Sequence, residues 1–310
     1  MSLLVVGSIA FDSVKTPFGE AREVLGGSAV YCSLAASYFA DVCLVGVVGS
    51  DFPDDHLQLL RERSIDLEGR EKTQGNTFRW KGEYGYDLNE AHTLETHLNV
   101  FEHFRPRLPE HYCGCDYVFL ANIDPVLQRE VVEQIKSPKL VACDTMNFWI
   151  RGKPDALRET LKRIDLLIIN DSETRELAEE PNIVKAARRI LSWGPKMLII
   201  KRGEYGALMI SDSTIFSAPA YPLESIYDPT GAGDSFAGGL MGYLANINNA
   251  TDTTIRQGII FGTAMASFNV EEFSINRLKN LSYKEIEARF REIKKITHFE
   301  DTLEVNQREI

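Results

Sequence analysis

The sequence predicts a three-layer α/β fold in which helices cover both faces of a mainly parallel central sheet. Short apolar runs alternate with helix-forming stretches along most of the chain, which is the order of a parallel sheet with crossover helices. Between Gly69 and Phe104 this alternation stops, and residues 77–86 alternate aromatic with charged side chains, a pattern typical of a half-buried strand. We therefore expect a small additional sheet inserted into a single domain that spans residues 1–310.

The individual elements follow from local patterns. Buried strands are predicted where apolar residues form short runs, at 3–9, 42–48, 117–122, 140–143, 165–169, 197–201 and 214–220. Helices are predicted for the intervening stretches, at 30–38, 53–63, 128–136, 155–163, 183–193, 234–244 and 253–268. Pro53 suits the first position of its helix, and Ser282 with Glu285 forms a capping box that opens a last amphipathic helix.

Composition excludes several classes of protein. Hydrophobic residues make up 44% and charged residues 25% of the chain, which is ordinary for a globular protein, and the net charge of −11 argues against nucleic-acid binding. No apolar run approaches the ~20 residues that span a bilayer, and the start of the chain lacks the basic and apolar regions of a signal peptide. Five scattered cysteines fit reduced thiols, so we expect a cytoplasmic protein that does not bind membranes.

One glycine-rich loop predicts an anion site. Residues 228–234 read Asp-Pro-Thr-Gly-Ala-Gly-Asp and lead into a run of small and apolar residues that favours a buried helix. The first amides of a helix lack partners within it, and the helix dipole adds positive charge there, so phosphate binds well at such a point. Asp234 stands at this site, where a carboxylate competes with phosphate. We interpret it as a base that takes a proton from a nucleophile attacking the phosphate.

This loop, together with Ala237-Gly238-Gly239, resembles the C-terminal signature of the ribokinase-like (PfkB) carbohydrate kinases. The Gly26-Gly27 pair and the later Val48-Gly49-Ser50-Asp51 are similar to the family's N-terminal pattern, with Tyr31 where the family usually has Asn. The resemblance extends from Leu3 to about Arg291. It implies a ribokinase-like fold with a β-lid over the substrate, built mainly from about 70–104, with 12–25 as a second candidate segment. The lid is also the expected surface of a homodimer.

Polar residues follow several predicted strands, and we expect them to line one rim of the sheet: Asp12, Asn122, Asp144, Asn147 and Asn170. The candidates for substrate binding are Asp12, Gly26, Gly27, Asn122 and Asn147. Asp12 could equally be a solvated turn residue, and the glycine pair could serve close packing of helix on sheet.

Two further motifs suggest how a nucleotide binds. Asn170 and Glu173 form a capping box by spacing, and they also match the family's Asn-x-x-Glu motif, which the resemblance associates with magnesium and phosphate. The resemblance also places the turn at 201–206 beside the nucleotide. The implied nucleotide contacts are Asn170, Glu173, Lys201, Gly203, Gly206 and Thr230. Glu173 is the candidate for Mg²⁺, and Asp228 with Thr230 marks the place of a monovalent cation such as K⁺.

The resulting hypothesis is transfer of the γ-phosphoryl group of ATP to a hydroxyl of a small sugar or sugar derivative. Asp234 is the expected base, and the amides of Gly231, Ala232, Gly233 and Asp234 are the expected anion hole. One alternative is an adenosine-like nucleoside kinase of the same fold, because Tyr31, Phe78 and Trp80 would suit contact with a nucleobase. Another alternative is a non-catalytic nucleotide or sugar sensor. A dinucleotide-dependent oxidoreductase lacks support, because no Gly-x-Gly-x-x-Gly follows the first strand. Arg79, Lys81 and Arg151 are either surface charges or contacts to a phosphate already on the acceptor.

Overall fold

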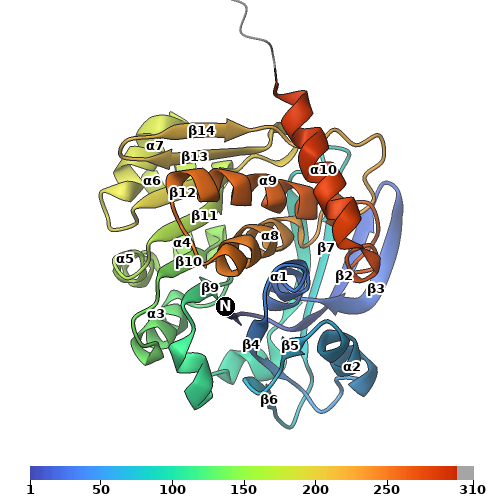
Figure 1. Cartoon of the computed structure of the whole chain (residues 1–310). Helices are drawn as coiled ribbons and strands as arrows, with labels where there is room; N and C mark the ends of the chain where they lie inside the picture. The colour runs from blue at the N-terminus through green and yellow to red at the C-terminus, as the bar shows by residue number, and fades with distance from the viewer. Residues whose placement is uncertain (299–310) are drawn as a thin grey trace, which may run out of the picture.

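The computed structural model describes residues 1–298 and contains a large, mainly parallel sheet (Figure 1). Its strand order is β14-β13-β12-β11-β10-β9-β1-β4-β5, and β6 pairs with β4. The strands are β1 (Leu3–Val6), β4 (Val42–Val48), β5 (Ile65–Asp66), β6 (Arg70–Lys72), β9 (Tyr117–Leu120), β10 (Leu140–Asp144), β11 (Leu166–Asn170), β12 (Met197–Lys201), β13 (Ala207–Ser211) and β14 (Ile215–Ala218). Only the pairings of β13 are antiparallel. The predicted α/β class is confirmed.

Helices cover both faces of this sheet, and each face has its own hydrophobic core. One core joins the sheet to α1 (Ser28–Ala36), α2 (Asp54–Glu62), α8 (Ala232–Ile247), α9 (Asp252–Asn269) and α10 (Tyr283–Ile296). The other joins it to α3 (Pro125–Gln134), α4 (Asn147–Gly152), α5 (Pro154–Leu161), α6 (Asp171–Ala178) and α7 (Ile183–Leu191). Successive residues of β1 enter opposite cores, as the period of two in a strand requires.

A second sheet of four strands stands beside the main one, which confirms the expected additional sheet (Figure 1). Its order is β3 (Gly19–Gly26), β2 (Ala10–Thr16), β7 (Phe78–Tyr84) and β8 (Ala91–His97). We call these four strands and the β7–β8 turn the lid. The parallel pairing of β2 with β7 joins two segments that are far apart in sequence.

Glycines allow α8 to lie very close to the two helices beside it. A Cβ atom on Gly238 would lie 2.2 Å from the carbonyl oxygen of Cys32 in α1, and one on Gly242 would lie 2.8 Å from the Cα of Ala36. On the other side of α8, a Cβ atom on Gly239 would lie 2.9 Å from the carbonyl oxygen of Phe261 in α9. The small residues of this helix therefore permit backbone contacts that larger side chains would prevent.

Some boundaries differ from the predictions. The first strand ends at Val6 rather than Ile9, and Asp12 lies inside β2 instead of directly at the end of that strand. Helix α4 and strand β8 were not predicted. All five cysteines are free thiols. Within residues 1–298, no helix combines the length and the apolar character that a membrane span needs.

Candidate active site

The glycine loop enters α8 through a left-handed residue. Gly231, the N-cap, has φ 77°, and no side chain caps the helix. The carbonyl oxygens of Pro229 and Gly231 accept the amides of Ala232 (3.1 Å) and Ser235 (2.8 Å). The amide of Gly233 has no hydrogen-bond partner among residues 1–298 and is free to bind an anion from outside. Of the four predicted anion-hole amides, that of Ala232 is already engaged.

Asp234 lies in the first turn of α8 and keeps partial exposure. Burial of its carboxylate raises the pKa to about 7, the nearby charge of Asp144 adds to this rise, and Lys201 opposes it. At neutral pH the group is therefore divided between its carboxylate and protonated forms, the state that suits a general base.

Lys201, at the end of β12, connects to the end of β10 and to the start of α8. Its Nζ lies 2.9 Å from Oδ2 of Asp144, and the two side chains are only 19% and 7% exposed. Nζ is also 2.9 Å from the position that a Cβ atom on Gly233 would occupy. Burial alone would lower the pKa of Lys201, but the carboxylates of Asp144, Glu173 and Asp234 outweigh burial and raise it. The lysine therefore stays charged beside the free amide of Gly233.

Asn170 and Glu173 form the capping box that their spacing predicts. Oδ1 of Asn170 accepts the amide of Glu173 at 2.7 Å, and Oε2 of Glu173 accepts the amide of Asn170 at 3.1 Å. Burial and the charge of Asp144 raise the pKa of Glu173 to about 7, although Lys201 opposes them. An added cation would relieve this crowding of negative charge, which fits the Mg²⁺ that the motif implies.

No group of three or more metal-ligating His, Cys, Asp or Glu side chains occurs in the described part of the chain. In nucleotide sites Mg²⁺ usually takes one or two carboxylates and completes its shell with substrate phosphates and water. Glu173 and Asn170 fit that limited role.

Asp12 and the glycine pair come together in a buried corner. Asp12 is 4% exposed, and its Oδ2 accepts the amide of Gly27 at 3.3 Å. A Cβ atom on Gly26 would lie 1.9 Å from that same Oδ2, so only glycine leaves room for the carboxylate. Burial raises the pKa of Asp12 to about 7 against the hydrogen bond from Gly27, and the charges of Asp228 and Asp234 raise it further. The structure thus brings Asp12 near both acids of the glycine loop.

Asp228 supports the glycine loop from within. It is 1% exposed, and its carboxylate accepts the amides of Thr230 at 2.9 Å and Ser274 at 3.0 Å. Burial raises its pKa despite these bonds. Oγ1 of Thr230 lies 3.3 Å from the hydroxyl of Tyr84 in the lid. Thr230, which was predicted for both the cation and the nucleotide, therefore also connects the loop to the lid.

Within residues 1–298, neither Asn122 nor Asn147 makes a side-chain hydrogen bond to Asp12 or to the glycine pair. The amide group of Asn122 is engaged on both sides, because Oδ1 accepts Nε1 of Trp149 at 3.0 Å and Nδ2 lies 2.9 Å from Sδ of Met146. Asn147 is exposed at the start of α4, and its backbone is near the Glu173 carboxylate. The structure therefore brings Asn147 toward the predicted nucleotide side and not toward Asp12.

The turn between β12 and β13 needs its two glycines. Gly203 has φ 53° and Gly206 has φ 82°, which favours glycine, and a Cβ atom on Gly206 would lie 2.1 Å from the carbonyl oxygen of Ala218. A Cβ atom on Gly203 would lie 2.0 Å from Oδ1 of Asn89. The lid turn consequently rests on the predicted nucleotide turn, which the sequence did not indicate.

The lid aromatics have different partners from those expected. Phe78 stacks on Phe101 at 5.3 Å between ring centroids, and Nε1 of Trp80 donates to Thr93 at 3.2 Å. Tyr84 is the lid aromatic that reaches the glycine loop, and burial raises the pKa of its hydroxyl. Sequence reasoning recognised Tyr84 only as part of a strand, and it placed Asp144 on the rim without assigning it to the site.

Each cation suggested for a phosphorylated acceptor is paired with a carboxylate. Arg79 lies 2.9 Å from Asp51 and 2.7 Å from Glu23. Lys81 lies 2.6 Å from Glu95. Arg151 pairs with Glu176. These pairs argue that the three cations serve the fold and the surface.

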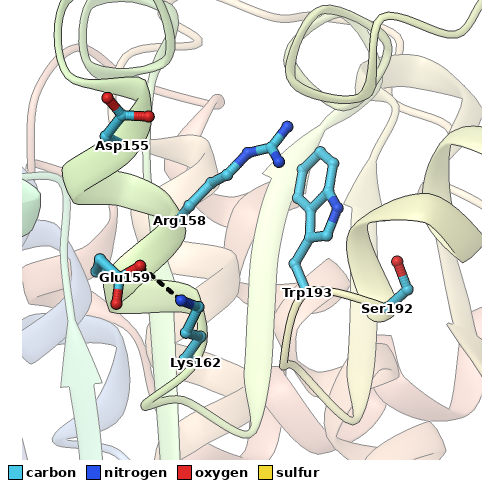
Figure 2. A pocket seen from close by; sticks show the side chains of 6 residues that line it. All are labelled: Asp155, Arg158, Glu159, Lys162, Ser192 and Trp193. Atoms are coloured by element: carbon cyan, nitrogen blue, oxygen red, sulfur yellow. Dashed lines mark hydrogen bonds and ion pairs between the residues drawn. The ribbon is translucent and has the colours of Figure 1, made fainter.

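A surface hollow of about 420 Å³ lies elsewhere on the molecule (Figure 2). Arg158 stacks over Trp193 at 4.0 Å within it. The hollow is lined by residues along α5 and just after it, from Asp155 to Lys162, which lead into β11, and by Ser192 and Trp193, which follow α7 and lead into β12. It therefore belongs to the amino edge of these strands, opposite the edge that carries Asp144 and Lys201.

Comparisons with known proteins bear on the family and the fold. The sequence model of the pfkB family carbohydrate kinases matches residues 3–279. A cytidine kinase of Thermococcus kodakarensis is 30% identical over 250 residues, covering 78% of this chain and 88% of that protein. A nucleoside kinase of Burkholderia thailandensis, solved in complex with ADP-inosine, has a TM-score of 0.76 at 19% identity, covering 98% of this chain and all of that one (100%). An Escherichia coli protein assigned as a ribokinase II, solved with ATP and Mg²⁺, has a TM-score of 0.75 at 18% identity, covering 94% and 99%.

Proposed function

Because this chain belongs to the pfkB family of carbohydrate kinases, we propose that it transfers the γ-phosphoryl group of ATP to a hydroxyl of a small, neutral, sugar-containing acceptor. One observation carries this proposal. Asp234, a partly exposed residue whose carboxylate has a pKa of about 7, stands at a helix start beside the amide of Gly233, which has no partner within residues 1–298. A binding protein without turnover would have no need for a base at that point, so a kinase is favoured over a sensor.

In the proposed step, the acceptor oxygen bonds to the γ-phosphorus while the bond from that phosphorus to the β,γ-bridging oxygen breaks. The acceptor proton passes to a carboxylate oxygen of Asp234. The amides of Gly231, Gly233 and Asp234 would hold the phosphoryl oxygens, where preorganised donors stabilise the charge that develops. Lys201 adds a fixed positive charge next to Gly233.

The nucleotide side of the proposed site follows the strand ends. Asn170 and Glu173 would hold Mg²⁺ through water, and the cation would neutralise phosphate charge when ATP binds. The turn with Gly203 and Gly206, together with Lys201, would face the nucleotide. Asp228 and Thr230 would mark a K⁺ site beside the loop. The ATP and Mg²⁺ in the ribokinase II structure support this cofactor assignment.

The acceptor is proposed to be a nucleoside, with a free sugar as the second candidate. The cytidine kinase from Thermococcus and the nucleoside kinase bound to ADP-inosine support the nucleoside. The pairing of Arg79, Lys81 and Arg151 supports an acceptor without a phosphate. The buried acids Asp12 and Asp228 would also repel an anionic acceptor.

The test measures ADP release with Mg·ATP and a panel of acceptors: cytidine, inosine, adenosine, ribose, fructose and ribose 5-phosphate. We expect turnover with a neutral member, and Asp234→Asn should lower kcat by about 100-fold or more while ATP still binds. Asp252→Asn, in the exposed first turn of α9, is the matched control and should keep full activity. ATP binding without turnover on any acceptor would favour the sensor, and full activity of Asp234→Asn would remove the base. Repeating the assay in KCl and in Tris chloride tests the K⁺ site.

A further inference from the structure

Tyr31 has a buried hydroxyl group that makes no hydrogen bond within residues 1–298. The residue is 1% exposed and lies in the first turn of α1, with its amide bonded to the carbonyl oxygen of Gly27 at 3.2 Å. Its ring rests on the glycine loop, because a Cβ atom on Gly231 would lie 2.4 Å from two ring carbons. Tyr31 therefore lies between the two glycine segments of the site.

The surroundings of this hydroxyl are acidic. Burial and then the charges of Asp12, Asp228 and Asp234 hold the pKa of Tyr31 well above its usual value, so the phenol stays protonated and is available as a donor. A buried donor without a partner loses its bonds to water and gains nothing in return. An arrangement of this kind beside reactive groups is typical of a site that awaits a ligand.

The chemistry of the neighbours indicates which ligand group fits. In their ionised form the carboxylates can only accept hydrogen bonds, and the phenol has a proton to donate. A hydroxyl group placed between them would accept from Tyr31 and donate to a carboxylate, so it satisfies both. A ligand carboxylate or phosphate could also accept from Tyr31, but the three acids would repel it.

We infer that Tyr31 is a specificity-determining residue whose hydroxyl hydrogen-bonds a non-reacting hydroxyl of the acceptor. This inference rests on the proposed function and names a contact within the same site. The tyrosine that replaces the family's usual asparagine would then have a role of its own, and one hydroxyl of the acceptor would be recognised at this position.

The experiment compares wild type with Tyr31→Phe on the acceptor that turns over, cytidine or ribose, and on its 2-deoxy and 3-deoxy analogues. With the full acceptor, Tyr31→Phe should raise KM by about three- to tenfold, the effect of one hydrogen bond, while kcat changes less than twofold. With one of the two deoxy analogues, wild type and variant should have the same KM. The free variant should melt at the same temperature as wild type or higher, because it lacks an unpartnered buried hydroxyl.

Tyr38→Phe is the matched control. The hydroxyl of Tyr38 donates to the carbonyl oxygen of Leu278 at 2.5 Å, so its loss should lower the melting temperature and leave KM unchanged. An unchanged KM in Tyr31→Phe, or an equal rise on the full acceptor and both analogues, overturns the inference while the kinase proposal stands. Failure of wild type to phosphorylate any acceptor overturns the proposed function and this inference with it.

Discussion

Replacing Asp12 with Asn should stabilise the free protein and weaken acceptor binding. In the folded chain, burial and the neighbouring acids raise the pKa of Asp12 from 3.8 to about 7. As pH rises from about 4 to 7, the unfolded chain therefore releases this proton before the folded chain does. The folded state then binds more protons than the unfolded state, so the free energy of unfolding falls with rising pH until Asp12 is ionised in both.

The two pKa values set the size of the effect. The raised pKa of Asp12 destabilises the fold by about 4 kcal/mol at pH 8, where the carboxylate is ionised in both states, and by about 2 kcal/mol at pH 5, where folding requires the uptake of a proton. Asparagine has the same shape and can accept the Gly27 amide through its oxygen, but it carries no charge. The stabilisation of Asp12→Asn over wild type should therefore be larger at pH 8 than at pH 5 by about 2 kcal/mol.

Urea unfolding at pH 5, 6, 7 and 8, without ligands, measures this difference. KM for the acceptor should rise by roughly 10-fold or more in the same variant, since a hydrogen bond to a charged group is lost. If the difference in free energy of unfolding between Asp12→Asn and wild type does not change with pH, then burial does not raise the pKa of Asp12 and the reasoning is wrong. An unchanged KM would remove Asp12 from the acceptor site.

Two further substitutions test the loop and its lysine. Lys201→Met removes the charge that lowers the pKa of Asp234, so the acidic limb of the pH profile of kcat/KM, which lies near pH 7, should move to higher pH. The control is Lys196→Met, just before the first residue of β12, which should leave the limb in place. Gly231→Ala forces a residue with φ 77° to carry a Cβ atom against the Tyr31 ring, which should cost roughly 2–4 kcal/mol in urea unfolding. Gly114→Ala meets no atom within 4 Å and should be close to neutral, and equal stability of the two glycine variants would contradict the contact.

Elements with a buried face could be predicted from the sequence. The inner strands β1, β4 and β9 to β12 are short apolar runs because both of their faces enter a core, and each of these was found within a few residues of its position. The short strands β5 and β6 were not predicted. The capping box at Asn170 and Glu173 was predicted from spacing because both of its bonds are local. The same locality left its functional interpretation open, since a capped helix and a magnesium contact need the same residues.

The lid could be predicted only in outline. Every residue of β8 is exposed, so this strand has no alternation of polar and apolar side chains to reveal it. Asp12 was expected at the end of the first strand because local sequence gives no sign that the chain moves into a second sheet after Val6. The contacts of Tyr84 with Thr230 and of Asn89 with Gly203 depend on pairings between distant segments, which one sequence does not determine.

The position of the site follows from the packing of two helices. Gly27 is the N-cap of α1 and Gly231 is the N-cap of α8, and the glycines along α8 let the two backbones touch. Both helix starts therefore meet at the carboxyl edge of the sheet, with the Tyr31 ring between them. The glycines after Asp234 then serve a purpose separate from phosphate binding, because they fix the distance between the proposed acceptor site at Asp12 and Gly27 and the proposed anion hole at Gly231 to Asp234. Bulky substitution at Gly238 should for this reason impair phosphoryl transfer without touching any ligand.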